Sequence, residues 1–157
     1  MGKQSAVERY FEDWSVGERL ATGTFTLTEE RILAFAREYD PQIFHLDAQA
    51  AKNTIFGRLI ASGWQTAAIT MRLIVESGVF GSHGGIGMGV DGLRWLKPVF
   101  ANDTLRVEVE VTRTRANPDK PSGIAHFSMK TFNQDGEPVM TQTAIVMLPC
   151  RPEGSRA

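Results

Sequence analysis

The clearest hydrophobic pattern of the chain lies between residues 64 and 75. Apolar residues recur there every three or four positions and form one broad face, made of Trp64, Ala67, Ala68, Met71, Ile74 and Val75. Ser62 and Gln65, three positions apart, match the capping box of a helix start, and Gly78 is a suitable stop. The pattern predicts a long helix that ends at Glu76.

The sequence beyond Gly85 shows strand-like patterns. Residues 105–112 alternate strictly between apolar and polar side chains, as in an antiparallel strand with one buried face. Residues 123–132 and 138–148 indicate two more strands, joined by a turn at Asp135 and Gly136. We therefore expect an antiparallel meander in the second half of the chain.

The first half supplies one strand and shorter helices. Residues 20–27 are Thr-rich and partly alternating, which favours a strand. Thr28 can cap a helix that ends near Tyr39, because Pro41 biases the residue before it away from helical backbone. After a short irregular piece, Asp47 can cap a brief helix over residues 48–53. This order predicts an α+β fold in which one curved antiparallel sheet wraps one long central helix.

Composition narrows the range of functions. The 157 residues suit a single domain, which we expect to span residues 1–157 with an ordered core at about 10–149. Seventeen basic and 18 acidic side chains give a net charge of −1, which argues against nucleic acid as a partner. The lone Cys150 excludes a disulfide framework and a cysteine metal cluster.

The chain shows no signal peptide and no apolar stretch long enough to cross a membrane. We therefore expect a cytoplasmic protein with no membrane partner. Residues 1–9 are polar and predicted to fray, and residues 150–157 are predicted to form a loose tail.

Asp40 and His45 are the strongest candidates for acid–base chemistry. On a regular helix or strand their spacing would keep the two side chains apart. Pro41 requires a turn, in which a carboxylate and an imidazole can meet and deprotonate a water. The alternative is structural, with Asp40 as a turn residue and His45 as its partly buried neighbour.

The start of the long helix is the second candidate. If Ser62 accepts a hydrogen bond from the amide of Gln65, the N–H of Gly63 has no partner within the helix. Glycine lets a ligand approach the backbone, and the helix dipole favours a carbonyl oxygen that becomes negative. The alternative is an ordinary helix start whose amide binds water.

Other patterns carry no cofactor chemistry. Residues 87–92 satisfy the GxGxxG spacing, but they lead into a strand-like segment, so a dinucleotide site is not expected. The three histidines are too dispersed to support a zinc site. We expect no metal, nicotinamide or flavin.

Two segments carry a family resemblance: YDPQIFHLDAQAAKNTIFGRLIASGWQT and GVDGLRWLKPVFANDTL. Over roughly residues 10–148 the chain resembles the MaoC-like dehydratase family, which includes the R-specific enoyl-CoA hydratases. The resemblance implies the hot-dog fold, Asp40 and His45 as the dyad that holds the catalytic water, and Gly63 as the amide that binds the thioester oxygen. It also implies a site at a dimer interface, and hence a homodimer or a higher oligomer of dimers.

The activity implied by the resemblance is reversible hydration of a trans-2-enoyl thioester to a 3-hydroxyacyl thioester, with CoA as part of the substrate. Gln42 stands where many hydratases have Asn, which affects the expected substrate preference. The candidate substrate-binding residues are Gln42, Ser62, Trp64, Arg94 and Lys97, the last two for the CoA phosphates. Two alternatives stay open: a hot-dog thioesterase, for which the central helix offers only Glu76 as a carboxylate, and a non-catalytic acyl-CoA-binding module.

Overall fold

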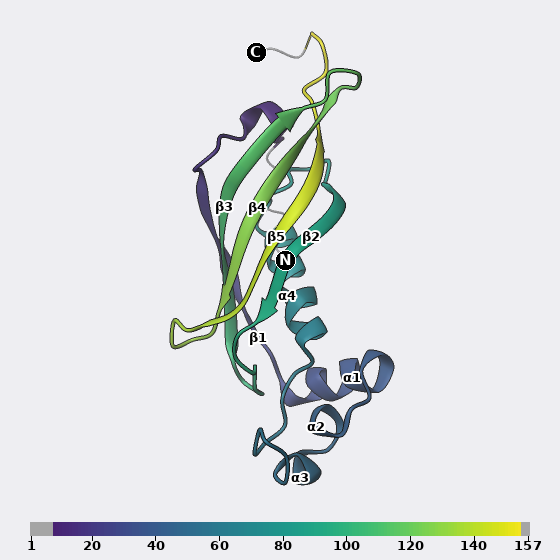
Figure 1. Ribbon diagram of the computed structural model, residues 1–157, viewed down its shortest axis with the longest axis vertical. Coiled ribbons are helices and arrows are strands. Elements are labelled where there is room, and N and C mark those ends of the chain that lie inside the picture. Colours follow the sequence, from purple (N-terminus) through teal and green to yellow (C-terminus); the bar gives the residue numbers. More distant parts are fainter. Residues whose placement is uncertain (1–7, 155–157) are drawn as a thin grey trace.

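A computed structural model describes residues 8–154 as a single antiparallel sheet wrapped around a helix. The strand order is β1-β3-β4-β5-β2. The elements in chain order are η1 (Phe11–Asp13), β1 (Arg19–Thr26), α1 (Glu29–Tyr39), α2 (Ile43–Leu46), α3 (Ala48–Ala51), α4 (Gly63–Glu76), β2 (Ile86–Trp95), β3 (Thr104–Ala116), β4 (Ser122–Phe132) and β5 (Pro138–Pro149). Figure 1 shows the sheet curving over α4, with α1, α2 and α3 gathered beyond one end of it. This is the predicted α+β, hot-dog arrangement.

The predicted strands and most of the predicted helices are confirmed. Strands β3, β4 and β5 cover the segments that alternation and turn residues indicated, and β1 covers the first predicted strand except for Leu27. The side chain of Asp47 accepts hydrogen bonds from the backbone N–H groups of Gln49 and Ala50, and so caps α3 as expected. The piece that the sequence left irregular contains α2, a single turn too short to show a period.

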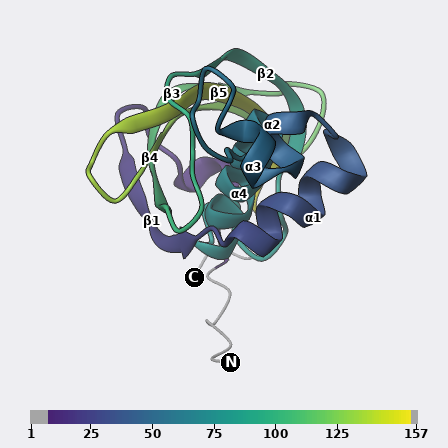
Figure 2. The same ribbon diagram turned by 90° about the horizontal axis from the view of Figure 1, so that it is seen from below.

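The core lies between the concave face of the sheet and α4. The view from below in Figure 2 shows the strands curving around this helix. The alternating residues of β3 supply much of this core, and Leu105, Val107, Val109 and Val111 are all buried. None of the helices within residues 8–154 has the length and apolar character to span a bilayer.

Helix α4 buries a different face from the one that the apolar spacing picks out. Its buried residues are Gln65, Thr66, Ile69, Thr70, Leu73 and Ile74. Of the predicted apolar face, Ile74 is buried, but Trp64, Met71 and Val75 are exposed by 60%, 43% and 58%. The sheet-facing side tolerates threonine because the Thr70 hydroxyl lies 2.9 Å from the Thr66 carbonyl and 2.7 Å from the Thr131 hydroxyl of β4.

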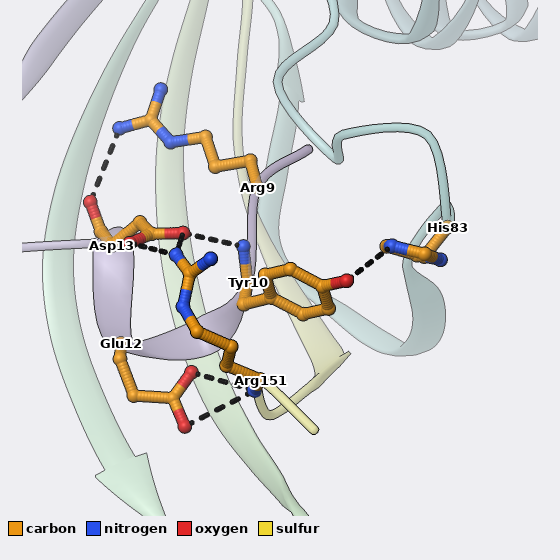
Figure 3. Close-up of polar contacts among 6 residues, drawn as sticks. All are labelled: Arg9, Tyr10, Glu12, Asp13, His83 and Arg151. Atoms are coloured by element: carbon orange, nitrogen blue, oxygen red, sulfur yellow. Dashed lines mark hydrogen bonds and ion pairs between the residues drawn. The ribbon is translucent and has the colours of Figure 1, made fainter. Parts of the chain in front are cut away.

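The chain end after β5 is attached to η1. The guanidinium of Arg151 donates to both carboxylate oxygens of Asp13 at 2.8 Å, and the backbone N–H of Arg151 donates to Glu12. Figure 3 shows these contacts beside the 3.0 Å hydrogen bond between the Tyr10 hydroxyl and His83 Nε2. The predicted loose tail is therefore wrong at Arg151.

The start of the described chain is held as well. Arg9 forms an ion pair with Glu18, and its guanidinium lies 3.2 Å from the centre of the Trp14 ring. The predicted fraying is thus wrong at Arg9. Residues 1–7 and 155–157 of the two predicted loose ends lie outside the described part.

Candidate active site

Asp40 and His45 meet in the turn that follows α1. Asp40 is the residue after the last turn of this helix, and the Gln42 N–H donates to the Asp40 carbonyl at 2.8 Å, which closes a tight turn around Pro41. Helix α2 then carries His45 back, so that His45 Nε2 lies 3.3 Å from Asp40 Oδ2. The turn therefore brings the two side chains together, as the sequence predicted.

The other nitrogen of His45 has a fixed partner. His45 Nδ1 lies 2.8 Å from the backbone carbonyl oxygen of Ile60, and the side chain of His45 is buried. A carbonyl oxygen can only accept a hydrogen bond, so Nδ1 carries the proton. Nε2, which faces Asp40, is then the nitrogen that can gain or lose a proton.

Three neighbours hold the carboxylate of Asp40. The Ser62 hydroxyl donates to Oδ2 at 2.6 Å, and the Gln42 amide donates to Oδ1 at 2.8 Å. Burial by itself raises the pKa of Asp40, but these two hydrogen bonds and the nearby His45 more than offset it, so the pKa lies below its ordinary value. Asp40 is therefore an ionised carboxylate at neutral pH.

The start of α4 differs in detail from the predicted capping box. The Ser62 hydroxyl accepts from the N–H of Trp64 at 3.2 Å rather than from Gln65. The side chain of Gln65 donates instead to the carbonyl of Arg31 at 2.8 Å, because it points toward α1. The expected consequence still holds, since the Gly63 N–H has no hydrogen-bond acceptor within residues 8–154.

The structure also shows why glycine occupies position 63. A Cβ atom there would lie 2.5 Å from the ring of Trp95, which packs directly on the helix start. No local sequence pattern indicates this contact, because Trp95 is 32 residues away at the end of β2. The close approach of a ligand to Gly63 stays a prediction.

These groups open onto one cleft of about 500 Å³. The dyad, Gly63, and the predicted residues Gln42, Ser62, Trp64 and Lys97 all line it. Its apolar wall includes Phe44, Phe56, Trp95, Leu96 and Val99, which the sequence did not single out as site residues.

The two predicted cationic residues are placed differently. Lys97 lies at the cleft and forms an ion pair with Glu137. Arg94 is not among the residues that line the cleft, and its guanidinium donates to the neighbouring Leu93 carbonyl at 2.9 Å. A role for either in binding CoA phosphates stays a prediction.

Residues 8–154 contain no group of three or more His, Cys, Asp or Glu side chains arranged to hold a metal ion. The cleft brings together an ionised carboxylate, an imidazole, and an amide at a helix N-terminus that has no acceptor within the described residues.

Three comparisons place the chain among known proteins. The sequence profile of the family described as MaoC like domain matches residues 13–131. The crystal structure of the MaoC-like dehydratase from Rhodospirillum rubrum shares 42% identity and a TM-score of 0.87, covering 92% of this chain and 99% of that one.

Two relatives from other bacteria are similar over most of their length. The (R)-specific enoyl-CoA hydratase of Aeromonas caviae is 34% identical over 116 residues, which are 74% of this chain and 80% of that protein. Uncharacterized protein YdeM of Bacillus subtilis is 32% identical over 123 residues, 78% of this chain and 86% of that protein.

Proposed function

The chain belongs to the family of MaoC-like domains, and from that membership we propose that it is an enoyl-CoA hydratase. It adds water reversibly to a trans-2-enoyl thioester and forms a 3-hydroxyacyl thioester. The observation that carries this proposal is the Asp40–His45 pair, with 3.3 Å between Oδ2 and Nε2, in one cleft with the unpaired amide of Gly63.

The dyad supplies the acid–base chemistry. A water held by Asp40 and by His45 Nε2 attacks C3 of the enoyl group. The dyad takes one proton from this water and supplies one proton at C2, so that OH and H add across the double bond. General acid–base catalysis of this kind contributes roughly 10²–10⁴-fold to the rate.

The start of α4 stabilises the negative charge that develops during the reaction. As water adds to C3, charge moves to the thioester oxygen, where the Gly63 N–H and the positive end of the helix dipole face it. One such donor is worth about 10²–10³-fold in turnover. The apolar wall of the cleft accommodates the acyl group, and no cofactor is needed apart from the CoA carried by the substrate.

We further propose that the working unit is a homodimer or an oligomer of dimers. Two apolar surfaces support this: the exposed stripe of α4 with Trp64, Met71 and Val75, and the exposed Met88 and Val90 of β2. Strand β2 is an edge strand of the sheet, and edge strands offer unpaired backbone groups to a partner.

No observation favours the thioesterase alternative. The carboxylate of Glu76 lies near the end of α4 remote from Gly63, where it pairs with Arg72 at 2.7 Å on the exposed surface. The non-catalytic alternative gives no reason for a carboxylate held by three neighbours beside an imidazole.

The test is the hydration of crotonyl-CoA, which is monitored as the loss of enoyl absorbance. We expect Asp40→Asn and His45→Ala each to lower turnover at least about a hundredfold while the protein stays folded. Matched controls are Asp119→Asn and His126→Ala, whose side chains lie outside the cleft. Near-normal hydration by either dyad variant would overturn the proposal, and release of free thiol without hydration would favour a thioesterase.

A further inference from the structure

The peptide group between Gly63 and Trp64 is held at both of its polar atoms. The indole N–H of Trp95 donates to the Gly63 carbonyl at 2.8 Å. The N–H of Trp64, on the same peptide group, donates to the Ser62 hydroxyl at 3.2 Å. Ser62 in turn donates to Asp40, so a chain of hydrogen bonds links Trp95 to the dyad.

Glycine makes this support necessary. Glycine has no Cβ atom and the widest choice of backbone angles of any residue, so nothing within the residue restrains the peptide groups beside it. The ring of Trp95 fills the space where a Cβ of residue 63 would lie, 2.5 Å from the nearest ring atom. The indole thus replaces, from outside the helix, the restraint that a side chain at position 63 would give.

The end of β2 is shaped to deliver this indole. Between Asp91 and Arg94 the strand has two residues, whereas β5 has one between the paired Thr143 and Thr141. This bulge shifts the alternation of side chains by one position. Gly92, inside the bulge, has a φ of +60°, which favours glycine.

A contact with a second aromatic ring also holds the Trp95 ring in place. The rings of Trp95 and Trp64 pack edge to face, with 5.2 Å between their centres. Trp95 is therefore fixed by a ring contact and by a hydrogen bond, although its side chain borders the open cleft.

We propose that Trp95 is a positioning residue of the active site, which clamps the first turn of α4 so that the Gly63 N–H stays directed at the thioester oxygen. This inference rests on the hydratase function proposed above. Trp95 acts through Gly63, and its contribution is largest in the transition state, where the charge on the oxygen is largest, and smaller for the neutral thioester oxygen of a bound ligand.

The decisive variant is Trp95→Phe, which keeps an aromatic ring over Gly63 and removes the N–H donor. Loss of one neutral hydrogen bond corresponds to roughly a five- to tenfold effect. We expect kcat for crotonyl-CoA to fall by about that factor, with KM changed less than about twofold and the pH dependence of kcat unchanged. An unchanged kcat, or a raised KM at unchanged kcat, would overturn the inference and leave Trp95 as a wall of the cleft.

A pair of ligands provides the internal control. A saturated acyl-CoA and the matching S-alkyl-CoA thioether share their carbon chain but differ in the carbonyl oxygen. If Trp95 acts on the amide that binds this oxygen, Trp95→Phe reduces the ratio by which the protein binds the thioester more tightly than the thioether. Equal weakening of both ligands contradicts the proposal.

Backbone hydrogen exchange separates this inference from the proposed function. In Trp95→Phe, the amides of residues 61–66 should exchange several-fold faster than in the parent protein, whether or not the protein hydrates crotonyl-CoA. If the parent protein lacks hydratase activity but the exchange changes, the function fails and the clamp stands. Unchanged exchange in this segment overturns the clamp.

Discussion

At the scale of single residues, the carboxylate of Asp40 shows how a local environment sets chemistry. Its folded-state pKa is lowered, so its contribution to stability is present above the pKa of the unfolded chain and is lost as the pH falls through the folded-state value. The same hydrogen bonds keep the group ionised at neutral pH. Ser62 matters most among the removable donors, because its 2.6 Å bond also ties Asp40 to the start of α4.

Ser62→Ala should therefore shift the acid side of the pH–rate profile. Without the hydroxyl, burial raises the pKa of Asp40 with less to oppose it, so activity is lost at a higher pH than in the parent protein. The measurement is kcat/KM for crotonyl-CoA from about pH 4 to about pH 8, a range that covers the usual pKa values of carboxyl and imidazole groups. Ser82→Ala, at an exposed position outside the cleft, is the matched control.

An acid limb that stays in place in Ser62→Ala would show that Asp40 does not govern it. The same variant should also unfold at a higher pH than the parent during acid titration, because the stability linked to the lowered pKa is reduced. Circular dichroism against pH measures this second effect without any substrate.

The sequence could predict the Asp40–His45 pair because a proline between them forces a turn. It could not predict the groups that tune the pair. The Ile60 carbonyl and the Ser62 hydroxyl come from 15 and 22 residues further along, and Trp95 lies 32 residues beyond Gly63. Contacts over such distances depend on how the elements pack, which no local pattern encodes.

At the scale of elements, α4 shows where periodicity misleads. The spacing correctly predicted a helix, and its C-terminal end at Glu76 matches the structure. It misidentified the buried side, because apolar character on one face of a helix does not say whether the sheet or another surface covers it. The buried side carries Thr66 and Thr70, and the Thr70 hydroxyl is hydrogen-bonded within the core to the Thr66 carbonyl and the Thr131 hydroxyl.

The buried Thr70–Thr131 pair should make this packing measurable. Thr70→Val keeps the shape but leaves the Thr131 hydroxyl without its partner, at a cost of about 1–3 kcal/mol in unfolding free energy. The double variant Thr70→Val/Thr131→Val should be less destabilised than the sum of the two single changes. Urea unfolding of the four proteins gives the coupling.

An exposed pair of the same chemistry serves as the control. The hydroxyls of Thr26 and Thr104 lie 2.8 Å apart on the surface, where water can replace either partner. Thr26→Val should therefore lower the unfolding free energy clearly less than Thr70→Val does. Equal losses of unfolding free energy would mean that burial of the Thr70 hydroxyl does not set the size of the effect.

At the scale of the whole molecule, the sheet and α4 leave apolar surface uncovered. The exposed stripe of α4 and the exposed face of β2 both lie on the described chain, and β2 ends the strand order on its side. Contiguous apolar surface on a folded chain marks an interaction site, and identical chains most often meet about a two-fold axis. The stripe that the sequence assigned to the core thus fits a role between chains.

This assignment predicts how the assembly responds to charge. Val90→Lys on β2 and Met71→Lys on α4 place an ammonium group on surfaces that are already exposed in the single chain, so the fold should survive both. We expect the parent protein to have at least twice the mass of the chain by light scattering at micromolar concentration, and both variants to shift toward the monomer. Thr112→Lys, on an exposed position of β3, should leave the mass unchanged. A parent protein that is already monomeric would contradict the dimer.

Because the cleft opens beside Trp64 and Trp95 at these same surfaces, loss of hydration in step with loss of the dimer would indicate that a second chain closes the cleft.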